Sequence, residues 1–342
     1  MTITTSTRVS EIGEFGLIAA LADALPLGAA MEAATGVGIG DDAAVWTPTP
    51  GERLVITTDA LVENVHFRLD WTDWRALGHK MLAVNISDLA AMGAIPRLVV
   101  ITLGLRGDER VVDLQDLYRG AGAIAISTGC RIAGGDIVRS PNALTFNITA
   151  IGESTNGKVL LRSGARQGDI VAVSGTLGAS AAGLEILLGH APATAATADL
   201  LRMAHHQPQP RVALGHLLLE HGASACMDLS DGLLGDLPKI LVASNVSATI
   251  SVDRIPVAAA IRSLFPDRWL DLATRGGEDY ELLFTVPPAA WPSLKEHAST
   301  IGTSLTAIGE IVPADPAPDL SLLNANGERV TITASAFDHF RE

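Results

Sequence analysis

Apolar residues in the first half of this chain alternate between short runs typical of strands and longer stretches with helical spacing. The clearest helical pattern runs from 73 to 92, and Asp73 stands where a helix N-cap is expected. The same pattern predicts further helices at 17–34 and 108–128, and strands at 53–58, 98–103, 131–133 and 143–152.

The turn-rich segment 153–157 separates these elements from a second series. In that series we expect strands at 169–174, 225–228, 249–252 and 280–286, and helices at 178–188, 210–220 and 231–244. The alanine-rich stretch 191–198 is interpreted as a loop or a helix end, and 191–209 receives no role. The alternation favours an α/β (α+β) protein with two domains, 1–153 and 154–342.

Composition narrows the class of protein. The chain has 342 residues, of which 48% are hydrophobic, so it can bury two cores. The formal net charge of -14 argues against nucleic acid as the main partner, because phosphate-backbone binding needs a basic surface. The first residues lack the apolar core of a signal peptide, and charges interrupt each apolar stretch before membrane-spanning length. We therefore expect a cytoplasmic protein without membrane contact.

The two cysteines, Cys130 and Cys226, both lie in apolar stretches and form no CxxC pair. This predicts buried, inert thiols rather than a zinc site or a disulfide framework.

Aspartates recur where an apolar segment meets a glycine, a hydroxyl residue or a helix. Residues in such positions can converge in space although they are far apart in sequence, and a cluster of carboxylates repels itself unless cations fill it. Oxygen ligands without nearby histidine or cysteine select hard ions, and Mg²⁺ is usually held by a few carboxylates together with substrate phosphates. The pattern therefore indicates a magnesium-dependent enzyme that acts on phosphates. The aspartates concerned are Asp42, Asp59, Asp88, Asp136, Asp228 and Asp231.

Asp88 is the strongest of these candidates when considered alone. Together with Met81, Asn85 and Met92 it follows the three- and four-residue spacing of one helix face. A carboxylate and an amide on an apolar face are costly unless they are hydrogen-bonded or bound to metal.

Two other motifs are set aside. The segment 152–158 nearly spells a P-loop, but Val159 replaces the required Ser or Thr and the following residues look extended instead of helical. His205 and His206 are adjacent, so on a helix their side chains diverge, and solvent exposure is expected rather than a shared metal ion.

A series of motifs in order along nearly the whole chain resembles the thiamine-monophosphate kinases. This family lies within the larger group that includes aminoimidazole ribonucleotide synthetase. The motifs are GEFGLI at 13–18, IGDDA at 39–43, TTD at 57–59, VHF at 65–67, NISDLAAMGA at 85–94, GGD at 134–136, MDLSDGL at 227–233 and GGEDY at 276–280.

The resemblance implies two α/β domains, of which the first supplies a four-stranded sheet that pairs with its counterpart in a homodimer. It also implies transfer of phosphate from ATP to thiamine monophosphate, at a site between the domains that holds several Mg²⁺ ions. We expect direct in-line attack by the substrate phosphate, which is already ionised near neutral pH, so that no catalytic base is assigned.

Residue by residue, the resemblance implies three sets of ligands. The metal set is Asp42, Thr57, Thr58, Asp59, Asp88, Asp136, Asp228 and Asp231. The ATP set is Tyr118, Gly135, Asp136, Arg162 and Ser230, and the thiamine monophosphate set is His66, Glu278 and Phe337.

Each of these positions also has an ordinary structural interpretation. Asp59 could merely end a strand, and Arg162 could form a surface ion pair of little consequence. His66 could be a core histidine, and Phe337 could be a core aromatic.

Two alternative functions stay open. The first is a sister ATP-dependent synthetase that makes a purine intermediate. Within the same group selenophosphate synthetase is disfavoured, because no reactive cysteine precedes Cys130. The second is a non-catalytic sensor of thiamine phosphates that keeps the fold and the acidic set.

Overall fold

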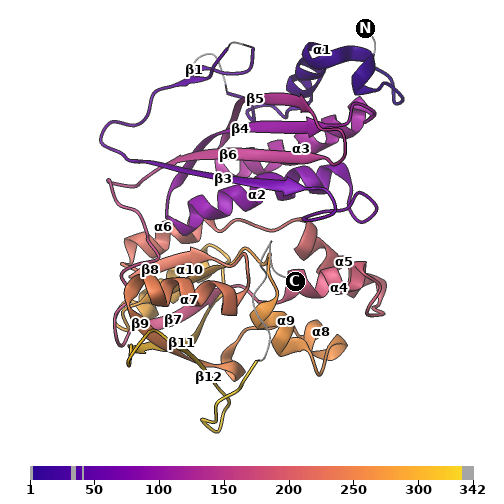
Figure 1. Ribbon diagram of the computed structural model, residues 1–342. Helices are drawn as coiled ribbons and strands as arrows, with labels where there is room; N and C mark the ends of the chain where they lie inside the picture. The colour runs from indigo at the N-terminus through magenta and orange to yellow at the C-terminus, as the bar shows by residue number, and fades with distance from the viewer. Residues whose placement is uncertain (1–2, 32–35, 41, 333–342) are drawn as a thin grey trace. The chain divides into compact units, whose positions relative to one another are not determined.

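The computed structural model describes residues 3–31, 36–40 and 42–332 and divides the chain into two compact units (Figure 1). Unit 1 comprises residues 1–89 and 95–157, and unit 2 comprises residues 90–94 and 158–342. Glu153, the predicted end of the first domain, is the last residue of a strand, and unit 1 continues to Gly157. None of the described helices has the length and apolar character needed to cross a membrane.

Unit 1 is built on a four-stranded sheet, as the resemblance implied. Strands β4 and β5 are parallel, whereas the other neighbouring pairs are antiparallel. Helix α3 (Val111–Thr128) connects the two parallel strands. The strand order is β3 (Leu54–Val62), β6 (Thr145–Glu153), β4 (Ile95–Leu105) and β5 (Arg131–Arg139).

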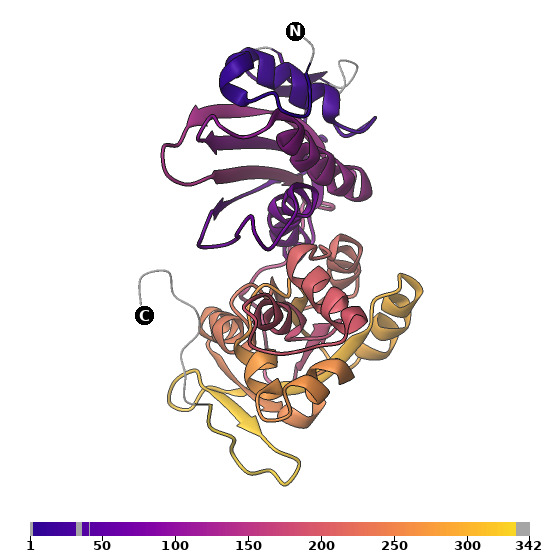
Figure 2. The ribbon, with the colours of Figure 1, turned by 90° about the vertical axis from the view of Figure 1, so that its right-hand side faces the viewer.

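Helices α2 (Trp74–Ala91) and α3 lie on one face of this sheet (Figures 1 and 2). The alternation along β6 explains why the helices cover this face, because Phe146, Ile148 and Ala150 point to it and are fully buried. The opposite face carries Thr58 and an exposed Ile56. We call this second side the open face of unit 1.

Helix α2 begins as the sequence predicted. The Oδ1 atom of Asp73 accepts a hydrogen bond from the backbone N–H of Ala76 at 2.7 Å, which confirms the N-cap. Gly78 lets α2 approach α3 closely, because a Cβ atom there would lie 1.8 Å from the Leu117 carbonyl oxygen. The face of α2 that carries Asn85 and Asp88 is thereby fixed against the sheet.

The helix predicted at 17–34 was wrong in its bounds. Helix α1 (Val9–Ala24) begins earlier, bends at Gly13 and ends before Pro26, whose ring disfavours helical geometry at the preceding residue. Two short antiparallel strands follow, β1 (Gly36–Val37) and β2 (Val45–Trp46).

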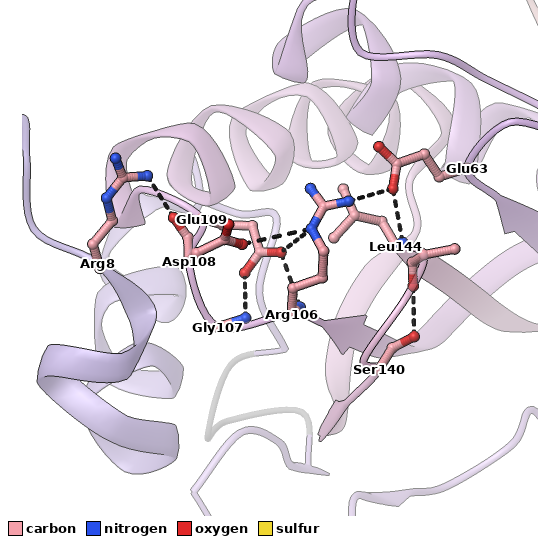
Figure 3. A network of polar contacts seen from close by, with 9 residues as sticks. Arg8, Glu63, Arg106, Gly107, Asp108, Glu109, Ser140 and Leu144 are labelled. Carbon is pink, nitrogen blue, oxygen red and sulfur yellow. Dashed lines mark hydrogen bonds and ion pairs between the residues drawn. The ribbon is translucent and has the colours of Figure 1, made fainter.

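An ionic network at the end of β4 ties the loops of unit 1 together (Figure 3). The guanidinium of Arg106 donates to Glu63 Oε2 at 2.5 Å, and the same oxygen accepts the Leu144 N–H at 3.0 Å. The Glu109 carboxylate accepts the backbone N–H groups of Arg106 and Gly107. This network holds the segment after β3 beside the start of β6.

Unit 2 contains a mixed six-stranded sheet. Strand β9 pairs in parallel with β12, and the other neighbours are antiparallel. The order is β12 (Leu320–Leu323), β9 (Val246–Ser251), β11 (Leu305–Pro313), β7 (Ile170–Ser174), β10 (Leu282–Val286) and β8 (Ala225–Asp228).

Both faces of this sheet are covered, because its strands are nearly continuous apolar runs. Val171 and Val173 pack with α7 (Leu233–Ser244) on one face. Ala172 and Phe284 pack with α6 (Val212–Glu220) and α10 (Trp291–Thr300) on the other. A separate cluster joins α4 (Ala179–Leu187), α5 (Ala195–His206), α8 (Ala259–Leu264) and α9 (Trp269–Arg275), and η1 (Val252–Arg254) follows β9.

Several predicted elements needed correction. Strand β3 continues through Asp59 to Val62, so Asp59 lies inside the strand and not at its end. Strand β5 continues through the two glycines of the GGD motif to Arg139, beyond the predicted 131–133. The stretch 191–198, predicted as a loop or a helix end, includes the first residues of helix α5, so the second alternative is correct from Ala195 onward. Elements α8, α9, α10, β11 and β12 were not predicted.

Candidate active site

In unit 1, strand β3 and helix α2 bring together three of the predicted metal ligands, Thr57, Asp59 and Asp88. Thr57 Oγ1 donates a hydrogen bond of 2.5 Å to Asp88 Oδ2. The buried Asn85 amide accepts the backbone N–H of Asp59 at 3.0 Å and donates to the Met81 carbonyl. Asn85 therefore satisfies its own buried polar groups by attaching β3 to α2, with Asp59 beside Asp88.

The electrostatic environment of Asp59 and Asp88 favours a cation. Partial desolvation raises the pKa of Asp59 to about 6, and the negative charge of Asp88 adds to the effect. The candidate ligand atoms are carboxylate and hydroxyl oxygens, which hard ions such as Mg²⁺ prefer. In the described part of the chain, no three His, Cys, Asp or Glu side chains gather into a metal site. Asp59 and Asp88 therefore stay candidate ligands, which by themselves supply only two carboxylates.

Two other predicted metal ligands of unit 1, Thr58 and Asp136, lie on the opposite face of the sheet from this pair. The hydroxyl of Thr58 donates to the Ile148 carbonyl at 3.0 Å and belongs to the open face, since neighbouring strand residues point to opposite sides. Asp136 stands on β5 in register with Thr102, on the same open face, and is exposed. Asp42 is exposed between β1 and β2.

Gly135 and Tyr118, both assigned to ATP, occupy packed positions. A Cβ atom at Gly135 would lie 1.8 Å from the Ile101 carbonyl oxygen, so the residue permits close pairing of β4 and β5. Tyr118 is buried on α3, and burial raises the pKa of its hydroxyl.

His66 lies in the turn after β3 and is half-buried. Its Nδ1 atom accepts the backbone N–H of Val62 at 3.1 Å, which places the proton of the neutral ring on Nε2. The neighbouring Phe67 is the core residue of this motif, because it is buried and stacks on Phe146 with ring centroids 5.4 Å apart.

In unit 2, the segments 228–232 and 276–281 run side by side. The Glu278 N–H donates to the Ser230 carbonyl at 2.9 Å, and the Tyr280 N–H donates to the Leu229 carbonyl at 2.9 Å. Gly277 makes this approach possible, because a Cβ atom there would lie 2.5 Å from the Ser230 oxygen. The structure therefore brings the MDLSDGL and GGEDY motifs together at one edge of the unit 2 sheet, although Ser230 and Glu278 are 48 residues apart in the sequence.

The acids of the MDLSDGL motif differ in their surroundings. Asp228 is buried at the end of β8. Asp231 Oδ2 lies 2.6 Å from the Lys239 ammonium, which also contacts the fully buried Asp236 at 2.8 Å. Burial raises the pKa of Asp236 despite this ion pair. Lys239 was not identified from the sequence, although its position eight residues after Asp231 on a predicted helix offered a signal.

The GGEDY loop is conformationally strained. Glu278 and Tyr280 have positive φ angles of 64° and 50°, which are unfavourable for side chains with a Cβ atom. The loop is held by the Asp279 carboxylate, which accepts the backbone N–H groups of Gly178 and Ser180 at 2.6 and 3.1 Å. Such strain persists only where the surroundings determine it, and it is concentrated at functional sites.

The structure also corrects the prediction for the histidine pair. His205 is 5% exposed, not solvated, and its Nδ1 atom lies 3.3 Å from Glu278 Oε2. Arg162 is exposed, and its carbonyl accepts the Ser244 hydroxyl at 3.2 Å. Phe337 lies outside the described residues.

Two remaining predictions are confirmed. Cys130 and Cys226 are buried free thiols, and burial raises the pKa of Cys130 to about 12. No helix follows Lys158 in the described chain until α4, so the near P-loop lacks the context of a phosphate loop.

Comparison with known proteins identifies the family. The family described as AIR synthase related protein, N-terminal domain, matches residues 40–154, and its C-terminal domain matches residues 166–317. Thiamine-monophosphate kinase of Escherichia coli K12 is 38% identical over 339 residues, covering 96% of this chain and 98% of that protein. The Bacillus subtilis enzyme of the same name is 34% identical, covering 89% and 94%.

Solved structures agree with this result. Thiamine-monophosphate kinase from Stenotrophomonas maltophilia K279a has 38% identity and a TM-score of 0.78, covering 86% of this chain and 92% of that one. AaThiL complexed with AMPPCP and TMP has 30% identity and a TM-score of 0.75, covering 98% and 100%. The hydrogenase maturation protein HypE of E. coli, with 20% identity and a TM-score of 0.74, shares the fold.

Proposed function

Because the chain belongs to the thiamine-monophosphate kinase family, we propose that it transfers the γ-phosphate of ATP to thiamine monophosphate, giving thiamine diphosphate and ADP. The observation that carries the proposal is the similarity to AaThiL complexed with AMPPCP and TMP, since it covers 98% of this chain. The identities of 34% and 38% to curated thiamine-monophosphate kinases favour this function over that of a sister synthetase.

The carboxylates of unit 1 support a magnesium requirement. Asp59 and Asp88 would hold an ion, with Thr57 beside them as a further oxygen. In unit 2, Asp228 and Asp231 offer further oxygens once the Lys239 ammonium is displaced from Asp231. Bound Mg²⁺ neutralises phosphate charge and so lowers the repulsion between ATP and a phosphorylated acceptor.

The remaining residues bind and orient the two substrates. In unit 2, Ser230 and Arg162 are proposed to contact ATP. Gly135 and Tyr118 of unit 1 stay predicted ATP contacts. His66 and Glu278 are proposed to hold thiamine monophosphate. The hydrogen bond that His66 Nδ1 accepts from the Val62 N–H sets the orientation of its ring.

The transfer is proposed to be direct and in line. An oxygen of the thiamine monophosphate phosphate forms a new bond to the γ-phosphorus, while the bond from that phosphorus to the β,γ-bridging oxygen breaks and ADP leaves with the electron pair. The attacking phosphate is largely ionised near neutral pH, so no side chain needs to remove a proton. A phosphorylated enzyme intermediate trapped by rapid quench would contradict this mechanism.

A homodimer is also proposed. The open face of unit 1 exposes Ile56 and part of Leu54 on an edge strand, which is a favourable place for a second copy to pack.

The decisive experiment is an assay of purified protein with ATP, thiamine monophosphate and Mg²⁺, in which thiamine diphosphate is separated and measured by thiochrome fluorescence. Product that disappears with EDTA is expected. A folded protein that binds ATP and thiamine monophosphate without turnover would favour the sensor instead. ATP turnover only with other acceptors would favour a synthetase.

A further inference from the structure

We propose that His205, on helix α5, is a positioning residue that sets the orientation of the Glu278 carboxylate and thereby the affinity for thiamine monophosphate. The inference rests on the proposed function, which assigns Glu278 to that substrate. It gives a role to the 191–209 segment, for which the sequence suggested none.

The location of His205 follows from the packing of α5. Ala198, Leu201 and His205 recur at helical spacing and are the buried residues of this helix, so the histidine stands on its apolar face. Gly183 of α4 allows the close contact, because a Cβ atom there would lie 2.2 Å from the Leu201 carbonyl oxygen. The same hypothetical Cβ atom would lie 3.2 Å from His205 Cβ, so the imidazole enters a tightly packed layer.

A buried imidazole needs polar partners, and the structure supplies two at the same nitrogen. The Ser180 hydroxyl lies 3.0 Å from His205 Nδ1, and Glu278 Oε2 lies 3.3 Å from it. Ser180 is itself 1% exposed. The geometry places a donor hydrogen at Nδ1 between a hydroxyl and the carboxylate assigned to substrate.

Glu278 needs such external support because its backbone is strained. Its φ angle of 64° is held by the N–H bond to the Ser230 carbonyl on one side and by the Asp279 bonds to α4 on the other. These bonds fix the main chain, whereas the position of the carboxylate depends on its side-chain contacts, of which His205 Nδ1 is one. The Glu278 side chain is 26% exposed and that of His205 is 6% exposed, so the outer part of the carboxylate can meet a ligand while the inner oxygen meets His205.

The packed layer of α4 and α5 also holds the rest of the GGEDY loop (276–280). Ser180 receives Asp279 at its backbone N–H and His205 at its hydroxyl, so one residue of α4 connects two neighbouring acids of the GGEDY motif. Ser230, which is assigned to ATP, contacts this loop only through its backbone carbonyl in the hydrogen bond from the Glu278 N–H. Movement of α5 would therefore shift the Glu278 carboxylate more directly than it would shift Ser230.

The test compares four variants by steady-state kinetics and by calorimetric binding of thiamine monophosphate. His205→Ala is expected to raise the KM and the Kd for thiamine monophosphate by about tenfold, the size of one lost hydrogen bond to a charged group, with the KM for ATP unchanged within about twofold. His205→Asn places a donor near the Nδ1 position and should restore most of the affinity. His205→Gln reaches instead toward the Nε2 position and should not.

The matched control is Leu201→Ala, which removes buried side-chain volume from the same face of α5 one turn earlier. It should lower the melting temperature at least as much as His205→Ala and leave the KM for thiamine monophosphate near the wild-type value. Equal increases in KM for both variants, or a His205→Ala protein that binds as the wild type does, would overturn the inference. If His205→Ala does not fold, the contrast between the Asn and Gln variants still decides, since equal affinities of these two would also overturn it.

The wild-type measurement distinguishes failure of the proposed function from failure of the role of His205. Wild-type protein that neither binds nor phosphorylates thiamine monophosphate would overturn the proposed function and this inference together. Wild-type binding with an unaffected His205→Ala variant would overturn only the role of His205.

Discussion

At the scale of single residues, the most informative contact is the unfavourable one between Asp59 and Asp88. Two carboxylates beside each other repel, and the raised pKa of Asp59 reflects both this repulsion and its partial desolvation. A bound cation would offset this repulsion, so the predicted metal role gives such a pair a reason that a cap or strand end would not.

Replacement of Asp59 by Asn tests this interpretation, because it removes the charge and keeps the shape. Turnover is expected to fall by at least about 100-fold at millimolar Mg²⁺, the scale of losing a group that stabilises transferred charge. The melting temperature measured in EDTA should stay the same or rise, because repulsion with Asp88 is relieved. Asp108→Asn, at an exposed position of the same unit, is the control. A clear loss of stability in Asp59→Asn would instead indicate a structural role.

Asp279 gives a prediction for pH. Burial raises its pKa to about 7, although the N–H groups of Gly178 and Ser180 oppose the shift, and Glu281 adds a further increase. The pKa is higher in the folded than in the unfolded state, so the folded state favours the proton. The contribution of Asp279 to stability is therefore greatest below about pH 4 and declines as the pH rises toward about 7.

The measurement is the melting temperature of wild type and Asp279→Asn from pH 5 to pH 8. The variant cannot ionise at this position, so its melting temperature relative to wild type should become more favourable as the pH rises. Asp267→Asn, an exposed residue of unit 2, should show a constant difference from wild type. A constant difference for Asp279→Asn as well would mean that its pKa is not raised.

At the scale of elements, the sequence predicted the bounds of an element best where a clear hydrophobic period coincided with a clear signal for its end. Strand β8 has the predicted bounds, and α2 differs by one residue at each end because Asp73 caps it and Gly93 follows it. The sequence did not distinguish the start of α5 from a loop, because its alanine-rich start fits both, and only packing against α4 shows which side of it is apolar.

The sequence singled out residues with oxygen ligand atoms, but it could not show which face of the sheet each of them occupies. The alternation of a strand sends Thr57 and Thr58 to opposite sides, so adjacent residues of one motif cannot bring both hydroxyls to one ion. Asp136 falls on the open face for the same reason, a consequence of register that requires knowledge of the strand pairing. The contact between His205 and Glu278 joins residues 73 positions apart and depends wholly on tertiary packing.

The two glycines of β5 give a matched test of element packing. A Cβ atom at Gly135 would lie 1.8 Å from the Ile101 carbonyl, whereas one at Gly134 would meet nothing within 4 Å. Gly135→Ala should therefore destabilise unit 1 by about 1–3 kcal/mol through forced separation of β4 and β5. Gly134→Ala should stay within about 0.5 kcal/mol of wild type in urea unfolding. Equal effects would mean that the close approach of Gly135 to β4 does not limit stability.

At the scale of the whole molecule, the open face of unit 1 is the feature that a single chain leaves unexplained. Ile56 is 63% exposed and Leu54 is 49% exposed on β3, an edge strand of the sheet. Exposed apolar side chains on an edge strand promote association, and natural proteins usually protect such edges with charges or with a partner. The proposed homodimer would provide that protection.

Ile56→Lys places a charge on this face and should convert the proposed dimer to a monomer, as measured by light scattering after size-exclusion chromatography. Val242→Lys is the matched control, since Val242 is 70% exposed on α7 of unit 2 and lies outside the proposed interface. The side chain of residue 56 points away from the side that carries Thr57 and Asp88, so the variant tests association without altering those groups directly. A monomeric wild type, or a dimer that Ile56→Lys leaves intact, would remove this face as the interface. A monomeric Ile56→Lys protein that still binds ATP but turns over thiamine monophosphate more slowly would link association to catalysis.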